Sequence, residues 1–379
     1  MALLKKIGAA AARYLRETDL LLLVCCLLAS AYGLLLVYSA VHGAGNSTFY
    51  MQAILTVLGI IIALVVTKWH YESISRLWYI WAGAAVLLVI LTLTPLGHAV
   101  AGQNAWLVFS IGGRSFSFQP TEILKLAFII TFSRHLSLVQ DTLQKPLTVL
   151  LLVLHGAAPI VLVFLQGDNG TALIFILVFL IMMFAAGIKP LYVIIGVVCI
   201  GVLVPFAWQV LGESLRLRIL SLFNPGLYPD VAYQQNYGLL ALGSGGLWGM
   251  GFLQGLQTTL FARDNDFIFT VAGEEFGFVG SLLVIALLLL VLVAIYRTAY
   301  RTKDRQGSLL CTGVFAMLMF QSLLNIGMVL RLMPVIGITL PFFSAGGSSV
   351  LTVYLGIGLV LSVHARMREQ TDTIFHRYS

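Results

Sequence analysis

Four carboxylates lie within one short stretch of the sequence, ARDNDFIFTVAGEEFGFVG, which runs from residue 262 to 280. They are Asp264, Asp266, Glu274 and Glu275, in a chain of 379 residues that has only 15 acidic residues. Asp266 stands directly before the apolar run FIFTVAG. A carboxylate held beside an apolar wall has a raised pKa, because desolvation disfavours its charged form, and it becomes a better general base. Asp266 is therefore the candidate catalytic residue.

Each of these acids also has a structural interpretation. Asp266 can cap the helix that follows it, and Asp264 can pair with its neighbour Arg263. Residues 277–296 are mostly apolar and long enough to cross a bilayer without the residues before them. Glu274 and Glu275 are therefore expected at the outer membrane interface.

A second group of candidates lies in FQPTEILKLAF, residues 118–128. Pro120 suits the first turn of a helix, so Glu122 meets the positive helix end, and Lys125 follows on the same face. Lys125 lies about 8 Å below Pro120 at the rise of an α-helix. Two interpretations stay open: an internal ion pair between Glu122 and Lys125, or a functional cation in a water-filled groove.

Three glycine-containing segments complete the candidates. Ser348 and Ser349 end the sequence GGSS, which offers hydroxyls and backbone amides at a helix N-terminus, as a phosphate seat or as a helix cap. Asp168 lies in the short turn QGDNGTA and suits a turn or cap. The glycine-rich segment 243–251 has no Walker lysine, so it is expected to form a flexible lid or to pack closely against a lipid.

The composition defines the class of protein that positions these residues. The chain is 60% hydrophobic and 10% charged, with a mean hydropathy of +0.98, whereas soluble domains carry about 25% charged residues. The continuous apolar segments exclude an outer-membrane barrel, whose strands alternate in short pieces. The four cysteines form no CxxC pattern, no cofactor is evident, and dependence on a divalent cation stays open. We predict an all-α, polytopic integral membrane protein.

Ten apolar segments are long enough to be membrane helices, because backbone polar groups must be paired in lipid. They cover residues 20–40, 51–67, 77–96, 119–137, 147–165, 170–187, 190–211, 270–296, 308–330 and 344–364. If these segments alternate across the membrane, 16 of the 22 Lys and Arg residues fall on the side of the N-terminus. The positive-inside rule then predicts that both termini are cytoplasmic. The net charge of +7 thus reflects topology and does not indicate a nucleic-acid partner.

The segments predict one membrane domain over residues 1–379, with cytoplasmic tails at 1–18 and 365–379. The extracytoplasmic loops cover about 97–118 and 212–269, the larger lying between helices 7 and 8. Loops of this length usually have a function or a partner. Since the second loop keeps aromatic and aliphatic residues throughout, we expect it to form short interfacial or re-entrant helices.

The motifs, in their order, resemble the SEDS family (shape, elongation, division and sporulation). The resemblance rests on FQPTEILKL, QGDNGTA, YQQ…ALGSGGLWGMG, NDFIF…GEEFGFVG and MPVIGITLPFFSAGGSS, and it covers nearly the whole chain. The essential family aspartate falls on Asp266, and Asn265 replaces the Thr that is common before it. The resemblance implies ten helices in the bacterial cytoplasmic membrane and a peptidoglycan glycosyltransferase acting on lipid II. It also implies a class B penicillin-binding protein as the transpeptidase partner, alongside membrane lipids.

On this hypothesis Asp266 removes the proton from the acceptor hydroxyl, and undecaprenyl pyrophosphate leaves the donor with inversion. The predicted substrate contacts are Glu122, Lys125, Arg114, Arg216, Arg218, Ser348 and Ser349. Two alternatives stay open: a flippase or transporter of lipid-linked precursors, and a non-catalytic scaffold for the penicillin-binding protein. The sequence does not distinguish elongation, division and sporulation.

Overall fold

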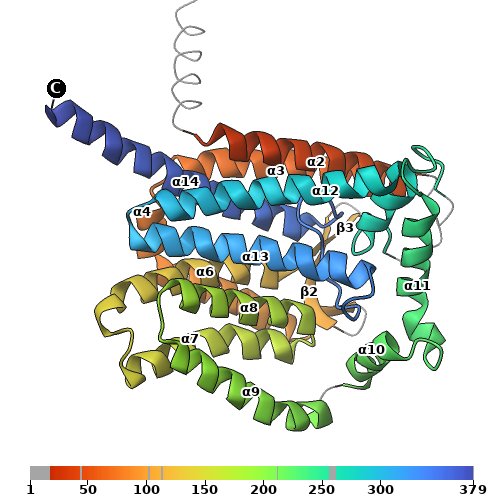
Figure 1. The fold of residues 1–379 in the computed structure, drawn as a ribbon, viewed down its shortest axis with the longest axis horizontal. Coiled ribbons are helices and arrows are strands. Elements are labelled where there is room, and N and C mark those ends of the chain that lie inside the picture. Colours follow the sequence, from red (N-terminus) through yellow and green to blue (C-terminus); the bar gives the residue numbers. More distant parts are fainter. Residues whose placement is uncertain are drawn as a thin grey trace, which may run out of the picture.

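The computed structural model describes residues 18–42, 45–100, 103–111, 114–210, 212–255 and 262–378 (Figure 1). The long apolar segments form a bundle of helices that run roughly side by side. The helices are α2 (Leu20–Ala40), α3 (Ser47–Thr67), α4 (Tyr71–Arg76), α5 (Trp78–Thr92), α6 (Pro120–Leu138), α7 (Pro146–Leu165), α8 (Asn169–Ala185), α9 (Pro190–Val210), α10 (Glu213–Phe223), α11 (Pro229–Ser244), α12 (Ile268–Arg301), α13 (Arg305–Val329) and α14 (Gly347–Tyr378).

Each of the ten predicted apolar segments coincides with a helix. Within the described residues, six helices are long and apolar enough to cross a membrane, namely α2, α3, α7, α12, α13 and the part of α14 up to Met367. Helices α5 and α8 are apolar but shorter. The chain is therefore a helical, polytopic membrane protein. Helix α14 continues to Tyr378, so the segment predicted as a tail from residue 365 is helical.

The expectation of an all-α fold is wrong in one place, because the predicted loop 97–118 forms a three-stranded antiparallel sheet. Its strands are β1 (Gly97–Val100), β2 (Gln103–Ile111) and β3 (Arg114–Phe118), with β2 in the centre. Leu107 of β2 lies opposite Gly97 on one side and Phe118 on the other. Ala105 and Leu107 are buried, and Trp106 between them is less buried, as the two-residue period of a strand requires.

The predicted loop 212–269 contains α10 and α11, which lie at one end of the bundle in Figure 1. The glycine-rich segment that follows α11 packs on α12 where α12 kinks at Gly277 (φ 66°). The Phe278 amide donates to the Gly246 carbonyl at 2.9 Å, and the Met250 amide to the Glu274 carbonyl at 2.9 Å. A Cβ on Gly249 would lie 2.1 Å from a backbone oxygen of α12. The glycines thus allow close backbone packing against this helix, instead of the expected lid or lipid contact.

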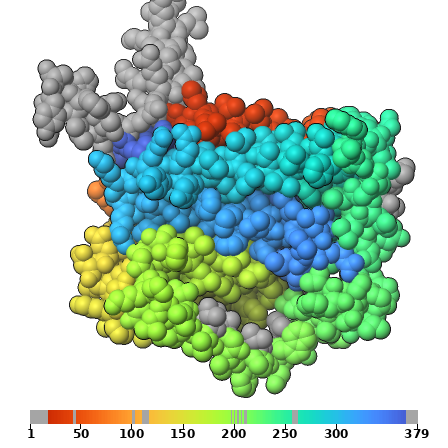
Figure 2. All heavy atoms as spheres, viewed as in Figure 1, coloured from red at the N-terminus to blue at the C-terminus, as the bar shows by residue number. Residues whose placement is uncertain are grey.

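The core lies around α13 and α14. In their membrane-length windows, 67% of the α13 residues and 83% of the α14 residues are buried, against 22% for α7. Helix α9 is peripheral, since each of its described side chains is at least partly exposed. The space-filling view shows α12 and α13 packed into one surface and a hollow beside α9 (Figure 2). Helix α14, the most buried of these, begins at the end of the bundle that carries the candidate site.

Candidate functional site

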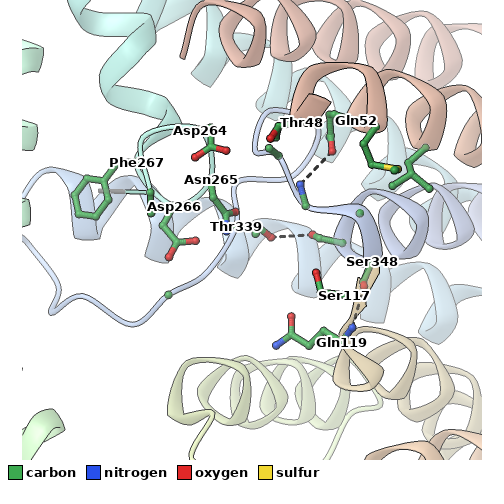
Figure 3. Close-up of a pocket in the computed structure, with 18 of the residues that line it drawn as sticks. Thr48, Gln52, Ser117, Gln119, Asp264, Asn265, Asp266, Phe267, Thr339 and Ser348 are labelled. Carbon is green, nitrogen blue, oxygen red and sulfur yellow. Dashed lines mark hydrogen bonds between the residues drawn. The ribbon is translucent and has the colours of Figure 1, made fainter. Parts of the chain in front are cut away.

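A cavity of about 1120 Å³ lies at the end of the bundle where α3, α6, α12 and α14 begin. The N-terminal turns of these helices, or the residues just before them, line it, together with β2, β3 and the segment 335–339. A helix N-terminus carries a partial positive charge and unpaired amide groups, which favour an anionic ligand. Figure 3 shows Asp264 and Asp266 on one side of the cavity and Ser117, Gln119 and Ser348 on the other.

The structure places Asp266 in the wall of this cavity, in the turn 262–267 that precedes α12. Burial, and after it the charge of Asp264, raise the pKa of Asp266 to about 6, against the opposing effect of Arg218. Asp168 adds a small effect in the same direction as Asp264. A carboxylate with this pKa is largely deprotonated at neutral pH and binds a proton more readily than an ordinary aspartate, which are the properties of a general base.

The backbone of this turn is held by three hydrogen bonds. The carbonyl oxygens of residues 264, 265 and 266 each accept one hydrogen bond from elsewhere in the chain. The donors are the Ala345 amide at 2.8 Å, the Ser344 hydroxyl at 2.6 Å and the Asn325 side-chain amide at 2.8 Å. The carboxylate of Asp266 is thus presented by a fixed backbone, as a preorganised site requires.

Arg218 is the one predicted arginine that the structure brings into the cavity wall within the described residues. Its Nη1 donates to the Val335 carbonyl at 3.0 Å. The segment that contains Val335 turns at Gly337 (φ +68°), where a Cβ would lie 3.7 Å from Oδ2 of Asp266. Burial lowers the pKa of Arg218, and the charge of Asp266 raises it. A cation and a carboxylate therefore share the same face of the cavity.

Ser348 and Ser349 line the cavity at the start of α14. The Ser348 hydroxyl accepts from the Gln119 amide at 2.9 Å, and the hydroxyls of Ser349 and Thr339 lie 2.8 Å apart. The Gln52 side chain accepts from the Gly346 amide at 3.1 Å. The serines thus bond to neighbouring segments and face the cavity, and among the described residues no hydrogen bond joins their hydroxyls to the first-turn amides of α14 as a helix cap would. The phosphate seat stays a prediction.

Glu122 and Lys125 form a buried ion pair with an N···O distance of 2.7 Å, and neither lines the cavity. The structure thus shows the internal pair that was one of the two open interpretations. Behind the cavity wall, Asp168 caps α8 by accepting from the Thr171 amide at 3.0 Å, and it accepts from the Gln119 side chain at 2.9 Å. Burial raises the pKa of Asp168. Asp168 thus bonds to Gln119 of the wall, and Glu122, Lys125 and Asp168 are not among the residues that line the cavity.

Two predicted arginines lie elsewhere. Arg216 donates to the Gln209 carbonyl and is not among the residues that line the cavity. Arg114 begins β3, and its side chain lies outside the described part of the structure. Among the described residues, no three His, Cys, Asp or Glu side chains converge to hold a metal ion.

The structure contradicts the expected pairing of Asp264 with Arg263. Arg263 turns away from Asp264 and pairs with Glu274 at 2.8 Å and Glu275 at 3.5 Å. Both glutamates are buried within the protein, and their place at the outer membrane interface stays a prediction. Asp264 instead faces the cavity. Neighbouring residues of a tight turn point in different directions, which a sequence pattern does not reveal.

The sequence reasoning missed several residues of the wall, among them Trp106 and Gln103 of β2, Ser117 of β3, and Gln52. Gln103, Trp106 and Ser117 could not be placed at the cavity from the sequence, because no strands were predicted in the loop 97–118. Gln52 is a buried polar residue within a helix that is apolar enough to cross a membrane, which could have indicated it. Its side chain donates to the Ser344 carbonyl at 3.0 Å.

Comparisons with known proteins identify the class. Residues 19–369 match the family model FTSW_RODA_SPOVE, described as cell cycle protein. The chain belongs to this family, which is the SEDS family that its motifs resemble, and the prediction is confirmed.

Relatives from three branches match nearly the whole chain. The chain is 33% identical to stage V sporulation protein E of Bacillus subtilis, over 91% of this chain and 96% of the relative. It is 31% identical to the probable peptidoglycan glycosyltransferase FtsW of Geobacter metallireducens, over 92% and 95%. It is 29% identical to the peptidoglycan glycosyltransferase RodA of Treponema pallidum, over 93% and 99%.

Solved structures show the same fold. One chain from a study of polymerization and crosslinking by a peptidoglycan synthase complex matches with a TM-score of 0.77 and 29% identity, over 92% of this chain and 98% of that chain. RodA of Thermus thermophilus matches with a TM-score of 0.66 and 26% identity, over 92% and 96%. The family and the apolar spans make this chain a multi-pass protein of the bacterial cytoplasmic membrane.

Proposed function

We propose that this chain is a peptidoglycan glycosyltransferase that polymerises lipid II in the cavity described above, with Asp266 as the general base. The observation that carries the proposal is the position of Asp266: it lies in the cavity wall, with a pKa of about 6, on a turn held by three backbone hydrogen bonds. The names of its relatives, which include peptidoglycan glycosyltransferases, support this reaction class.

In the proposed reaction, Asp266 takes the proton of the 4-hydroxyl of the acceptor GlcNAc. The resulting oxygen nucleophile bonds to the anomeric carbon of the donor MurNAc and inverts it. The bond from that carbon to the pyrophosphate oxygen breaks, and undecaprenyl pyrophosphate leaves with the electron pair. One displacement at one centre needs one base, together with positive charge at the leaving group. It does not need the two carboxylates of a retaining glycosidase.

Arg218 and the start of α14 at Ser348 and Ser349 supply positive charge and hydrogen-bond donors in the cavity wall. We assign the pyrophosphate to these groups. The buried pair of Glu122 and Lys125 supports them from behind, and Arg114 and Arg216 stay predicted contacts of the substrate outside the described wall.

We further propose the membrane arrangement that this reaction needs. All ten apolar segments cross the membrane within a single domain over residues 1–379, both termini are cytoplasmic, and the loops 97–118 and 212–269 are extracytoplasmic. The cavity then opens outside, where lipid II presents its sugars while its polyprenyl chain stays in the bilayer. A class B penicillin-binding protein, which crosslinks the new strands, is the proposed partner.

A polymerisation assay with purified protein and its partner tests the proposal. Wild-type protein is expected to convert lipid II into glycan strands, and folded Asp266→Ala protein is not. Equal polymerisation by both proteins would refute the role of Asp266. Absence of strands from both, with Asp266→Ala complementing in cells, would indicate the scaffold alternative.

A further inference from the structure

A cluster of three charged side chains lies behind the turn that carries Asp266. Arg263 is bracketed by Glu274 and Glu275, at 2.8 Å and 3.5 Å from its Nη2. The relative exposures are 5% for Arg263, 0% for Glu274 and 2% for Glu275, so the cluster is almost closed to solvent. Charges this deeply buried are stable only when they are paired and hydrogen-bonded with good geometry.

The cluster joins four segments of the chain. Glu275 accepts hydrogen bonds from the Ser39 hydroxyl of α2 and from the Leu253 amide at 3.2 Å. Gly255 packs so closely against the cluster that a Cβ on this glycine would lie 2.5 Å from Nη2 of Arg263. The base-bearing turn, α12, α2 and the segment after the glycine-rich loop therefore meet at one buried point.

The cluster is coupled to Asp266 through a short, closed turn. The Ala262 carbonyl accepts from the amides of Asn265 and Phe267, both at 3.1 Å. Arg263 is the second residue of this turn, so a shift of its side chain moves the backbone on which Asp266 stands. The three carbonyl hydrogen bonds hold the cavity side of the turn, and only Arg263 ties the turn to α12 through a side-chain ion pair within the described residues.

The direction of the Arg263 side chain also determines whether its positive charge lies in the cavity. Asp264 and Asp266 both line the cavity, and no ion pair joins either of them to a cation in the part of the chain that the structure describes. An arginine three residues before Asp266 would be close enough to neutralise either carboxylate if its side chain turned into the cavity. Glu274 and Glu275 hold it on the opposite side of the turn.

We propose that Arg263 is a positioning residue for Asp266, and that Glu274 and Glu275 hold it so that the turn stays in place and its cation stays out of the cavity. This inference rests on the proposed function and adds a reason for the GEEFG motif, whose carboxylates the reaction itself does not use. None of the three side chains lines the cavity, so their effect on the reaction is transmitted through Asp266.

The first test is Arg263→Lys, which keeps the charge but loses the planar fork that reaches two carboxylates. We expect the kcat for lipid II polymerisation to fall by about 10- to 100-fold, since a misplacement of about 1 Å has effects of this size, while KM changes less than about twofold. Arg305→Lys is the matched control, because Arg305 donates to the Ala186 carbonyl at the other end of the bundle. This control is expected to keep wild-type kcat.

A double-mutant cycle separates positioning from a general loss of packing. Glu274→Gln keeps the shape of the side chain and removes its charge, and it is measured alone and together with Arg263→Lys. If the residues act as one unit, the two effects on kcat are not additive. The pH profile is the second readout. In Glu274→Gln the Arg263 guanidinium is held less firmly and can approach Asp266. Its positive charge then lowers the pKa of Asp266, so the acidic limb of kcat moves to lower pH.

Several outcomes overturn the inference. One is a wild-type kcat in folded Arg263→Lys and Glu274→Gln. Another is strictly additive effects of the two substitutions on kcat. The third is a loss of kcat that follows the fall in thermal midpoint, with no change in the pH profile. If Arg263→Lys does not fold, Glu274→Gln and Glu275→Gln carry the same test. Asp266→Asn is assayed in parallel: if it polymerises normally the proposed function fails, and if it is inactive while the cluster variants are normal only this inference fails.

Discussion

Two pairs of acids from one 12-residue stretch have opposite environments. Asp264 and Asp266 line an open cavity, whereas Glu274 and Glu275 are buried with Arg263 behind the same turn. Burial without a counter-ion raises the proton affinity of a carboxylate, and burial with a bracketing arginine keeps its charge paired. On the proposed function, Asp266 of the first pair transfers the proton, and the second pair holds the turn.

Asp266→Asn should separate activity from stability. Loss of the base is expected to lower the rate of lipid II polymerisation by about 10²- to 10⁴-fold. Because the pKa of Asp266 is raised in the folded protein, its charged form costs stability above the pKa of the unfolded chain, and the neutral amide removes that cost. The thermal midpoint should therefore not fall. A lower thermal midpoint with intact activity would show instead that Asp266 stabilises the turn and is not the base.

The wild-type enzyme should lose activity in acid. On the proposed mechanism the deprotonated form of Asp266 is the active base, and its pKa is about 6. We expect kcat/KM to be level above this pH and to fall by about tenfold per pH unit below it, as for a single protonation. Polymerisation rates measured between pH 4.5 and 8 test this acidic limb of the kcat/KM profile, with Tm recorded at each pH. An acidic limb near the ordinary pKa of about 4 for aspartate would contradict the cavity environment.

Glu275→Ala should act on stability more than on chemistry. The change leaves the Leu253 amide and the Ser39 hydroxyl without the acceptor that they share, and unpaired buried groups cost about 1–3 kcal/mol each. We expect a lower thermal midpoint for the protein in detergent. Leu289→Ala, on the exposed face of α12, is the control. A stability equal to that of the control would show that the buried pair is not needed to hold the turn.

Asp264→Asn should give the smallest effect and should change only the pH profile. The charge of Asp264 raises the pKa of Asp266, so its removal lowers that pKa. The acidic limb of kcat/KM then moves to lower pH, while the rate at pH 8 changes less than about threefold, because Asp266 is already deprotonated at that pH in both proteins. A limb that moves to higher pH, or a loss as large as that of Asp266→Asn, would place Asp264 in the reaction itself.

Much of the fold could be predicted because membrane helices are long, continuous and apolar. All ten segments were found in the sequence, and six of the corresponding helices have the length and composition of membrane spans. The sheet at 97–118 could not be found in this way, because a short apolar strand such as LVFSI does not differ in period from a loop or helix fragment. Trp106 was missed with it, although it lines the cavity.

The amino-acid sequence was enough to predict the class of protein, the helical segments, and Asp266 as the acid beside an apolar run. These depend on composition and on local order along the chain. Only the tertiary structure decided which acids face the cavity, where Arg263 finds its partners, and that Glu122 and Lys125 pair behind the wall. The physical reason is that the environment of a charge depends on the segments that surround it. Around the turn at 262–267, these include α2, α13 and the residues before α14, which lie far from the turn in the sequence.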